Sequence, residues 1–195
     1  MKRMAIFASG TGSNFQAIVD AVQKGSLQAT IALLICDKPE APVVEKAKRA
    51  NIPVFTFKPK EFASKAVFES LICKQLQDAK VDFIVLAGYM RLIGPTLLQA
   101  YPNKIINLHP SLLPAFPGKE AIKQAFQAGV KITGITIHYV DEGMDTGPII
   151  AQEAVAIHDD DTLFDVERKI HQVEHIFYPQ TLQKLCLTEY EEEFT

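Results

Sequence analysis

The sequence predicts an α/β fold: a single Rossmann-like domain with a mostly parallel central sheet of about seven strands and helices on both faces. Strand-like and helix-like segments alternate along the 195 residues, which is the pattern of βαβ units. The most apolar strand-like segment, 83–87, has the composition of a strand buried on both faces at the centre of a parallel sheet. With 48% hydrophobic and 22% charged residues, the chain can bury the core of one such domain.

The first half of the chain predicts four strands. Residues 4–8 form a short apolar run that ends at a glycine-rich turn, and 13–24 follow with apolar residues at helical spacing. β-branched and aliphatic residues predict a strand over 30–36, and Pro42 in a first turn predicts a helix over 42–50. A short strand over 53–57 and a helix over 62–79 then lead to the strand over 83–87.

The second half predicts three more strands. A short helix over 95–100 precedes a strand over 104–107, and a helix over 119–128 precedes strands over 132–140 and 148–157. The short connection between the last two strands permits them to pair antiparallel. A long helix over 162–185 closes the domain, which we assign to 1–188. We expect the acidic segment 189–195 to be a frayed tail.

Charge and cysteine content exclude several classes of protein. The net charge of -3 provides no basic field, so we expect no nucleic-acid partner. The apolar runs are too short for a signal peptide or a membrane span, so we expect no membrane association. The three cysteines are widely spaced and odd in number, which matches no disulfide framework or metal site. We therefore expect reduced, buried thiols and a cytoplasmic location.

A side-chain amide, an imidazole and a carboxylate are the most informative groups of the sequence. Asn107 and His109 follow the strand-like run 104–107, and Asp145 follows the strand-like run 132–140. Each could be a structural turn residue or a loop anchor on its own. Together, at strand ends, they suit a reaction that develops negative charge on a carbonyl oxygen and moves a proton. Residues 110–118 are proline-rich, which predicts a rigid irregular loop directly after the imidazole.

The glycine-rich turn at 8–14 predicts an anion site. Gly10 and Gly12 precede the predicted helix 13–24, whose first N–H groups and positive dipole end favour a phosphate. A tight turn without ligand explains these glycines equally well. A dinucleotide fingerprint would need glycine where Phe15 stands, although Asp37 follows the second strand as a ribose-binding acid would. A nicotinamide-dependent oxidoreductase is therefore a weaker alternative, and a non-catalytic phosphate-binding module is another.

Five motifs resemble the glycinamide ribonucleotide formyltransferases when they are taken together and in order. They are Gly10-x-Gly12-Ser13-Asn14, Leu86-Ala87-Gly88-Tyr89-Met90-Arg91, Asn107-x-His109-Pro110-Ser111-Leu112-Leu113-Pro114, Phe116-Pro117-Gly118 and Asp141-x-Gly143-x-Asp145-x-Gly147-Pro148. The similarity runs from about residue 2 to about residue 184. Methionyl-tRNA formyltransferases carry a basic C-terminal domain and formyltetrahydrofolate hydrolases an N-terminal regulatory domain, and we expect neither here. The resemblance makes 1–188 a formyltransferase catalytic domain.

The resemblance implies a role for each matching residue. The catalytic residues would be Asn107, His109 and Asp145. The substrate phosphate would lie on Gly12, Ser13 and Asn14, and the ribose or glycinamide part on His171 and Glu174. The folate-binding residues would be Lys65, Met90, Arg91, Leu92, Ile93, Asn107, Asp141, Glu142, Gly143, Met144 and Asp145. His171 and His175 are spaced like metal ligands on a helix, but no third ligand is evident and we expect no metal.

The implied reaction is formyl transfer from 10-formyltetrahydrofolate, a co-substrate, to the primary amine of glycinamide ribonucleotide. The products would be formylglycinamide ribonucleotide and tetrahydrofolate, within de novo purine biosynthesis. The partners would be these small molecules, and the enzyme would be a monomer or a homodimer. The two alternatives above leave the groups at 107, 109 and 145 unexplained, and this reaction uses all three.

Overall fold

The computed structural model describes the backbone of residues 1–192 and the side chains of residues 1–187. The strands are β1 (Lys2–Ala8), β2 (Ala29–Cys36), β3 (Val54–Thr56), β4 (Phe83–Leu86), β5 (Ile105–His109), β6 (Ile132–Tyr139) and β7 (Ile149–Ala156). The helices are α1 (Ser13–Gln23), α2 (Pro42–Arg49), α3 (Lys65–Asp78), α4 (Pro95–Ala100), α5 (Ala121–Gln127) and α6 (Leu163–Glu192), with a 3-10 turn η1 (Pro59–Glu61).

The strands form one seven-stranded sheet in the order β3-β2-β1-β4-β5-β6-β7. The pairs from β3 to β5 are parallel, and both the β5–β6 and the β6–β7 pairs are antiparallel. The predicted fold class and the antiparallel pairing of the last two strands are therefore confirmed. The antiparallel β5–β6 pair was not predicted; it makes β6 the reversed strand of this sheet.

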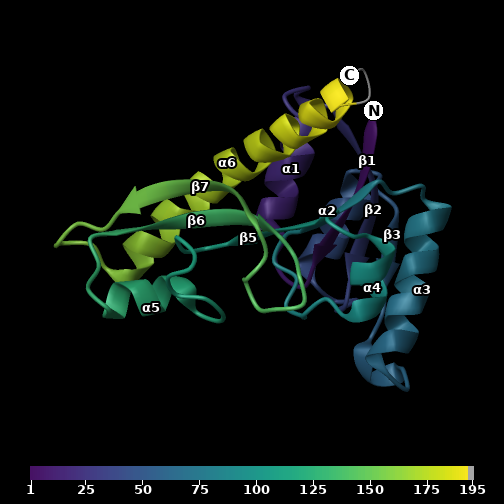
Figure 1. The fold of residues 1–195 in the computed structure, drawn as a ribbon, viewed down its shortest axis with the longest axis horizontal. Helices are drawn as coiled ribbons and strands as arrows, with labels where there is room; N and C mark the ends of the chain where they lie inside the picture. Colours follow the sequence, from purple (N-terminus) through teal and green to yellow (C-terminus); the bar gives the residue numbers. More distant parts are fainter. Residues whose placement is uncertain (193–195) are drawn as a thin grey trace.

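Helices cover both faces of the sheet, because successive residues of the buried strands point to opposite sides. Met4, Ile6 and Ala8 of β1 lie in a core shared with α1, α2 and α6, whereas Ala5 and Phe7 lie in a core shared with α3 and α4. Figure 1 shows α1 and α6 on one side of the sheet and α3 and α4 on the other. A third, smaller core joins α5 and the start of α6 to β6 and β7.

Several element boundaries differ from the prediction. The helix predicted over 62–79 begins only at Lys65, because the Ser64 hydroxyl accepts a hydrogen bond from the Val67 amide and caps it. Strand β5 continues to His109, two residues beyond its predicted end at 107. Helix α6 extends to Glu192, into the segment 189–195 predicted as a frayed tail, and residues 193–195 lie outside the described residues.

Tyr178 joins α6 to the strand ends that carry the site. The side chain is fully buried, and its hydroxyl donates to Leu86 O at 3.0 Å and to Ile106 O at 3.3 Å. Leu86 is the last residue of β4, and Ile106 directly precedes Asn107. The contact fixes α6 against the two strands from which the expected catalytic and folate-binding segments emerge. The three cysteines are free and buried, as predicted.

Candidate active site

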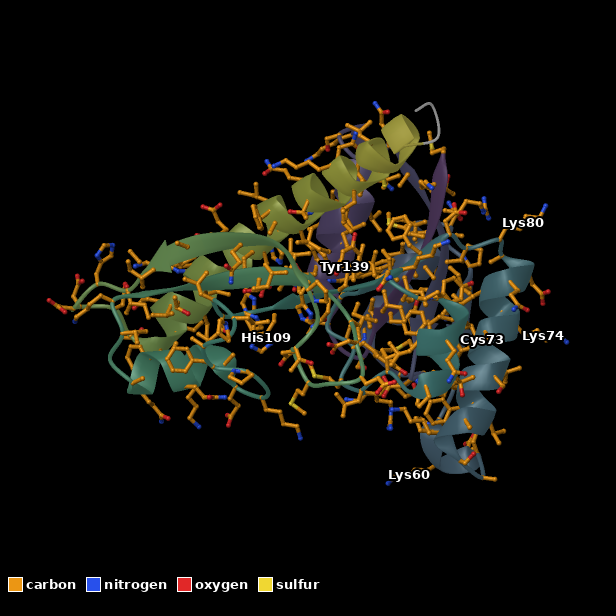
Figure 2. The ribbon with its side chains drawn as sticks, in the orientation of Figure 1. Lys60, Cys73, Lys74, Lys80, His109 and Tyr139 are labelled. Atoms are coloured by element: carbon orange, nitrogen blue, oxygen red, sulfur yellow. The ribbon has the colours of Figure 1, made fainter. Side chains whose placement is uncertain are left out.

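Asn107 and His109 lie within the last residues of β5 rather than on the loop after it. Residues i and i+2 of a strand point to the same face, so both side chains project from one side of the sheet. His109 is 5% exposed, and in Figure 2 it lies in the middle of the molecule, between α5 and α4. The strand therefore fixes the spacing of the amide and the imidazole.

Asp145 reaches this pair from the hairpin connection between β6 and β7. Because β6 runs antiparallel to β5, its last residue, Tyr139, pairs with Ile106 rather than with the end of β5. The connection must turn back along β5 for Asp145 Oδ2 to lie 3.3 Å from His109 Nδ1. Asp145 has a positive φ of 57°, and its Oδ2 also accepts the Gly118 N–H at 2.8 Å. Asp145 follows β6, as predicted, and converges with Asn107 and His109 although β6 runs opposite to β5.

His138 is a fourth member of the group, which the sequence analysis did not assign to the site. Its Nδ1 is 2.8 Å from Tyr139 O, so Nδ1 carries the proton, because a carbonyl only accepts. Burial lowers the pKa of His138, which favours the neutral ring and leaves a lone pair on Nε2. Asn107 Nδ2 lies 3.2 Å from that Nε2 and donates to it. The register that sets His138 opposite Asn107 thus orients the Asn107 amide.

Both ring nitrogens of His109 face acceptors. Nε2 is 2.9 Å from Phe116 O, and Nδ1 faces the Asp145 carboxylate. A neutral imidazole can donate its one N–H to only one of these acceptors, whereas a doubly protonated ring can donate to both. The Asp145 carboxylate thus lies where it would balance a positive charge on His109.

The loop after β5 is irregular, as its prolines predicted, and is fixed by hydrogen bonds from three sides. Ser111 Oγ donates to Ala115 O at 2.6 Å, and the Leu113 amide donates to Thr136 Oγ1 at 3.0 Å. Gln152 Nε2 donates to Leu113 O at 2.9 Å. These contacts hold the Phe116 carbonyl and the Gly118 amide where His109 and Asp145 meet them.

We expect His138→Ala to lower kcat by about fivefold, because Asn107 would lose the acceptor that fixes its amide, a bond of about 1 kcal/mol. Steady-state kinetics of formyl transfer measure this. His138→Gln offers a carbonyl to Asn107 and should recover part of the loss. Wild-type kcat in His138→Ala would show that Asn107 needs no such support.

The start of α1 has the features of an anion site. Gly12 precedes the helix with a φ of 71°, no side chain caps the first N–H groups, and no acidic residue lies in the first turn. These N–H groups have no partner within the helix. A Cβ on Gly12 would lie 2.5 Å from Val43 Cγ2. The positive φ of Gly12 and its close packing against Val43 of α2 therefore both require glycine, whether or not a ligand binds there.

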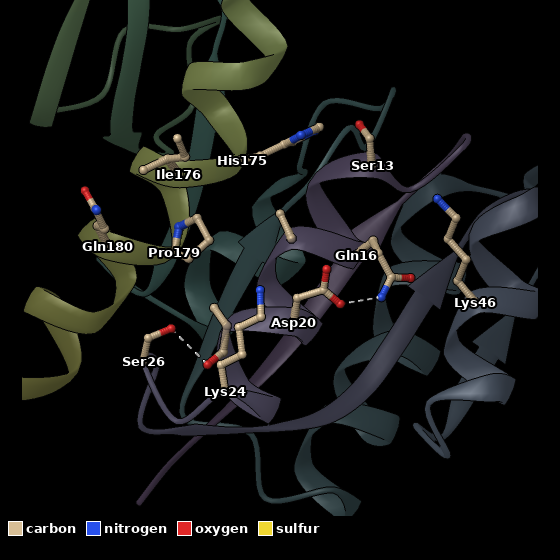
Figure 3. Close-up of a pocket in the computed structure, with 12 residues that line it drawn as sticks. Ser13, Gln16, Asp20, Lys24, Ser26, Lys46, His175, Ile176, Pro179 and Gln180 are labelled. Atoms are coloured by element: carbon tan, nitrogen blue, oxygen red, sulfur yellow. Dashed lines mark hydrogen bonds between the residues drawn. The ribbon is translucent and has the colours of Figure 1, made fainter.

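A groove of about 560 Å³ between α1 and α6 begins at this anion site. Figure 3 shows Ser13 and Gln16 of α1 on one side and His175 and Ile176 of α6 on the other. Lys46 also lines the groove, and its Nζ donates to Gly12 O at 3.3 Å. The sequence analysis missed Lys46, because only the packing of α2 on the glycine turn places this cation there. Asn107, His109 and Asp145 are not among the described residues that line this groove.

Glu174 connects α6 to the anion site. The carboxylate is 3% exposed, and Oε2 accepts from Asn14 Nδ2 at 3.0 Å and faces His171 Nδ1 at 3.0 Å. The side chain of Asn14 is thus turned towards Glu174, which leaves its backbone amide for an anion. Tyr178, one helical turn beyond Glu174, touches the carbonyl before Asn107. The predicted ribose-binding residues therefore lie on the path from the anion site to β5.

We expect the pKa of His171 to lie above the ordinary value of about 6.5, because the hydrogen bond to Glu174 raises it. A histidine whose pKa rises on folding stabilises the folded state fully below its unfolded pKa, and this contribution disappears as the pH rises through the folded value. NMR titration of the His171 ring measures the pKa. Glu174→Gln should lower it, and an unchanged value in that variant would show that the pairing does not set the charge.

Apart from Lys65 and Asn107, the residues expected to bind folate lie on two segments, one after β4 and one between β6 and β7. Met90 and Leu92 are 75% and 57% exposed, and Met144 on the other segment is 49% exposed. Ile93 is buried in the core shared with α3 and α4, so only its backbone can face a ligand. Lys65 is exposed at the start of α3. Of the remaining predicted residues, Asp141, Glu142 and Gly143 are exposed around Met144.

Asp37, the acid on which the nicotinamide alternative rested, is buried and paired with Arg91, whose side chain is 40% exposed. Asp37 is 5% exposed, its Oδ2 accepts from Arg91 Nε at 2.8 Å, and its Oδ1 accepts from Ser9 Oγ at 2.5 Å. Both carboxylate oxygens are thus hydrogen-bonded within the protein, which does not favour a role in binding a ribose. Arg91 balances a buried charge and anchors the segment that follows β4. Its Nε is engaged by Asp37, and a contact of Arg91 with folate stays a prediction.

Among residues 1–187, whose side chains are described, no cluster of at least three histidine, cysteine, aspartate or glutamate side chains could hold a metal ion. Within the same described part, no helix is both long and apolar enough to cross a membrane.

Comparison with known proteins gives consistent results. The family model described as formyl transferase matches residues 2–182. The chain is 59% identical over 185 residues to phosphoribosylglycinamide formyltransferase of Bacillus subtilis, covering 95% of each protein. It is 38% identical to the human trifunctional purine biosynthetic protein adenosine-3 over 93% of this chain but only 18% of that protein. The crystal structure of glycinamide ribonucleotide transformylase 1 from Geobacillus kaustophilus superposes with a TM-score of 0.93 at 61% identity, covering 95% of this chain and 98% of that one.

Proposed function

This chain belongs to the formyl transferase family, and we propose that it transfers the formyl group of 10-formyltetrahydrofolate to the amine of glycinamide ribonucleotide. The products would be formylglycinamide ribonucleotide and tetrahydrofolate, in de novo purine biosynthesis. The observation that carries the proposal is the convergence of Asn107, His109 and Asp145 from β5 and the β6–β7 connection. Similarity to enzymes named for this reaction, over nearly the whole chain, supports it.

Asn107 and His109 would stabilise the charge that develops when the amine adds to the formyl carbon. One N–H of the Asn107 amide is held by His138, and the second is available to the formyl oxygen. His109 Nε2 would exchange Phe116 O for that oxygen, which is the stronger acceptor once it is charged. Asp145 would balance the imidazolium through Nδ1. Donors of this kind contribute on the order of 3 kcal/mol each to lowering the barrier.

Proton transfer must balance across the reaction. The attacking amine loses one proton, and the departing nitrogen of the folate gains one, so no net proton is consumed. Asp145 lies beside both His109 and the expected reaction centre, and a water held by its carboxylate could relay the proton. The reaction needs no metal, and we propose that the enzyme uses none.

The surface beside β5 fits the flat, partly polar ring of a folate. Met90, Leu92 and Met144 present exposed apolar side chains on the segments after β4 and between β6 and β7. Exposed apolar side chains close to convergent polar groups are typical of small-molecule sites. The backbone of 90–93 and of 141–145 would supply the polar contacts, as the family resemblance implies.

The ribonucleotide would extend from the start of α1 to β5. Its phosphate would lie at Gly12, Ser13 and the Asn14 backbone, and Glu174 and His171 would contact the ribose or glycinamide part. Lys46, beside Gly12, adds a positive charge to this site. We propose that these small molecules are the partners, that the enzyme acts in the cytoplasm, and that it is a monomer or a homodimer.

A turnover assay with both substrates tests the proposal. The purified chain should convert glycinamide ribonucleotide only when 10-formyltetrahydrofolate is present, with formation of tetrahydrofolate. Free glycine in place of the ribonucleotide is a matched control, since it offers an amine without the phosphate. No turnover with the ribonucleotide, or equal turnover with glycine, would contradict the proposed substrate.

A further inference from the structure

Glu69 is a buried carboxylate that the proposed reaction does not use. It lies on α3, is 2% exposed, and its Oε1 accepts the Gly94 N–H at 2.7 Å. Its Oε2 is buried without a hydrogen-bond partner among the described residues. Burial raises the pKa of Glu69, and the backbone N–H groups of Gly94 and Leu97 and nearby Lys65 oppose that effect. Burying a carboxylate is costly even when hydrogen bonds compensate part of the cost, so a hydrophobic residue here would better serve packing alone.

Gly94 packs so closely against this carboxylate that a side chain would not fit. A Cβ on Gly94 would lie 2.6 Å from Glu69 Oε2, 2.9 Å from Glu69 Oε1 and 2.9 Å from Lys65 Cε. The φ of Gly94 is -97°, which any residue can adopt, so space rather than backbone conformation requires glycine. Gly94, the residue before α4, thus packs against two residues of α3: Lys65 at its start and Glu69 one turn later.

Gly94 is also the end of the segment that carries the exposed Met90 and Leu92. The opposite end of that segment is held by Ser9, whose amide donates to Gly88 O at 3.0 Å and whose Oγ accepts the Met90 amide at 3.0 Å. Met90 and Leu92 in the middle of the segment are exposed, and Arg91 between them is tied to Asp37. Glu69 is thus one of the contacts that fix the shape of the segment, and it acts at the second end.

We infer that Glu69 is a positioning residue for folate: it fixes the second end of segment 88–94 and the adjacent Lys65 in the geometry that the co-substrate needs. The inference rests on the proposed function, because it takes this segment as a wall of the folate site. Glu69 itself touches neither substrate. Its loss should therefore weaken folate binding and leave the chemical step and the ribonucleotide site unchanged.

Kinetics of three variants test the inference. In Glu69→Ala we expect the KM for 10-formyltetrahydrofolate to rise about tenfold, as for the loss of a hydrogen bond to a charged group, with kcat and the ribonucleotide KM within about twofold. Glu69→Gln keeps an acceptor for the Gly94 N–H and should restore most of the affinity. Leu76→Ala, at a fully buried site on the same helix, is the matched control: it should lower the melting temperature without changing the folate KM.

The outcomes separate the inference from the proposed function. An unchanged folate KM in Glu69→Ala, or an equal rise in Leu76→Ala, overturns the inference while wild-type turnover stands. Absence of wild-type turnover and of tetrahydrofolate binding by calorimetry overturns the proposed function instead. Should Glu69→Ala fail to fold, Glu69→Asp, which withdraws the carboxylate by one methylene, gives the same comparison: a raised folate KM supports the inference and a wild-type value overturns it.

Discussion

Replacing Asn107 or His109 by alanine, or Asp145 by asparagine, should lower kcat by about a hundredfold or more while each KM changes only a few-fold. The expectation follows from the loss of one group that stabilises charge in the transition state, worth on the order of 3 kcal/mol. Asparagine is the informative replacement at position 145. It tolerates the positive φ of 57° and can still accept the Gly118 N–H, yet it cannot balance a charged His109.

Combined variants should lose less activity than the product of the single losses, because the three groups act as a unit. Steady-state and single-turnover kinetics separate the chemical step from binding. Glu153→Gln is a suitable control, since it changes an exposed carboxylate on β7 outside both proposed sites. Near-normal kcat in any one of the three variants would remove that residue from the mechanism.

The second large effect is expected from Ser13→Asp, which should raise the KM for glycinamide ribonucleotide about a hundredfold and leave the folate KM unchanged. Two unit charges 4 Å apart near a protein surface repel by about 4 kcal/mol before screening, so a carboxylate at the start of α1 opposes the phosphate. The same carboxylate should stabilise the free protein slightly, because α1 has no acidic residue in its first turn.

Because Ser13→Asp should weaken ribonucleotide binding but slightly stabilise the free protein, weaker binding in this variant cannot be attributed to loss of folding. Calorimetric titration with each ligand and thermal unfolding of the free protein measure the two effects. Ser13→Ala is the control for the hydroxyl alone and should change the ribonucleotide KM far less. Ribonucleotide binding of wild-type strength in Ser13→Asp would place the phosphate elsewhere. Gly12→Val is a poorer test, because its side chain would collide with Val43.

Features that depend on local patterns of residues could be predicted from the sequence. The alternation of apolar strands with amphipathic helices predicted seven strands, two covered faces and most element positions, because burial repeats with the period of each element. Pro42 marked a helix start, and the prolines of 110–118 marked an irregular loop, since proline restricts the backbone wherever it occurs. The residue types of Asn107, His109 and Asp145 already indicated carbonyl chemistry.

The contacts between groups far apart in the chain could not be predicted in this way. Reversal of β6 sets His138 opposite Asn107 and requires the following connection to turn back to His109. The packing of α2 brings Lys46 to the glycine turn, and Asp37 is taken up by Arg91. These contacts depend on strand register and on the docking of segments far apart in the chain. The periodicity of a segment specifies which of its faces is buried, but the group that it meets there is fixed only when the whole core packs.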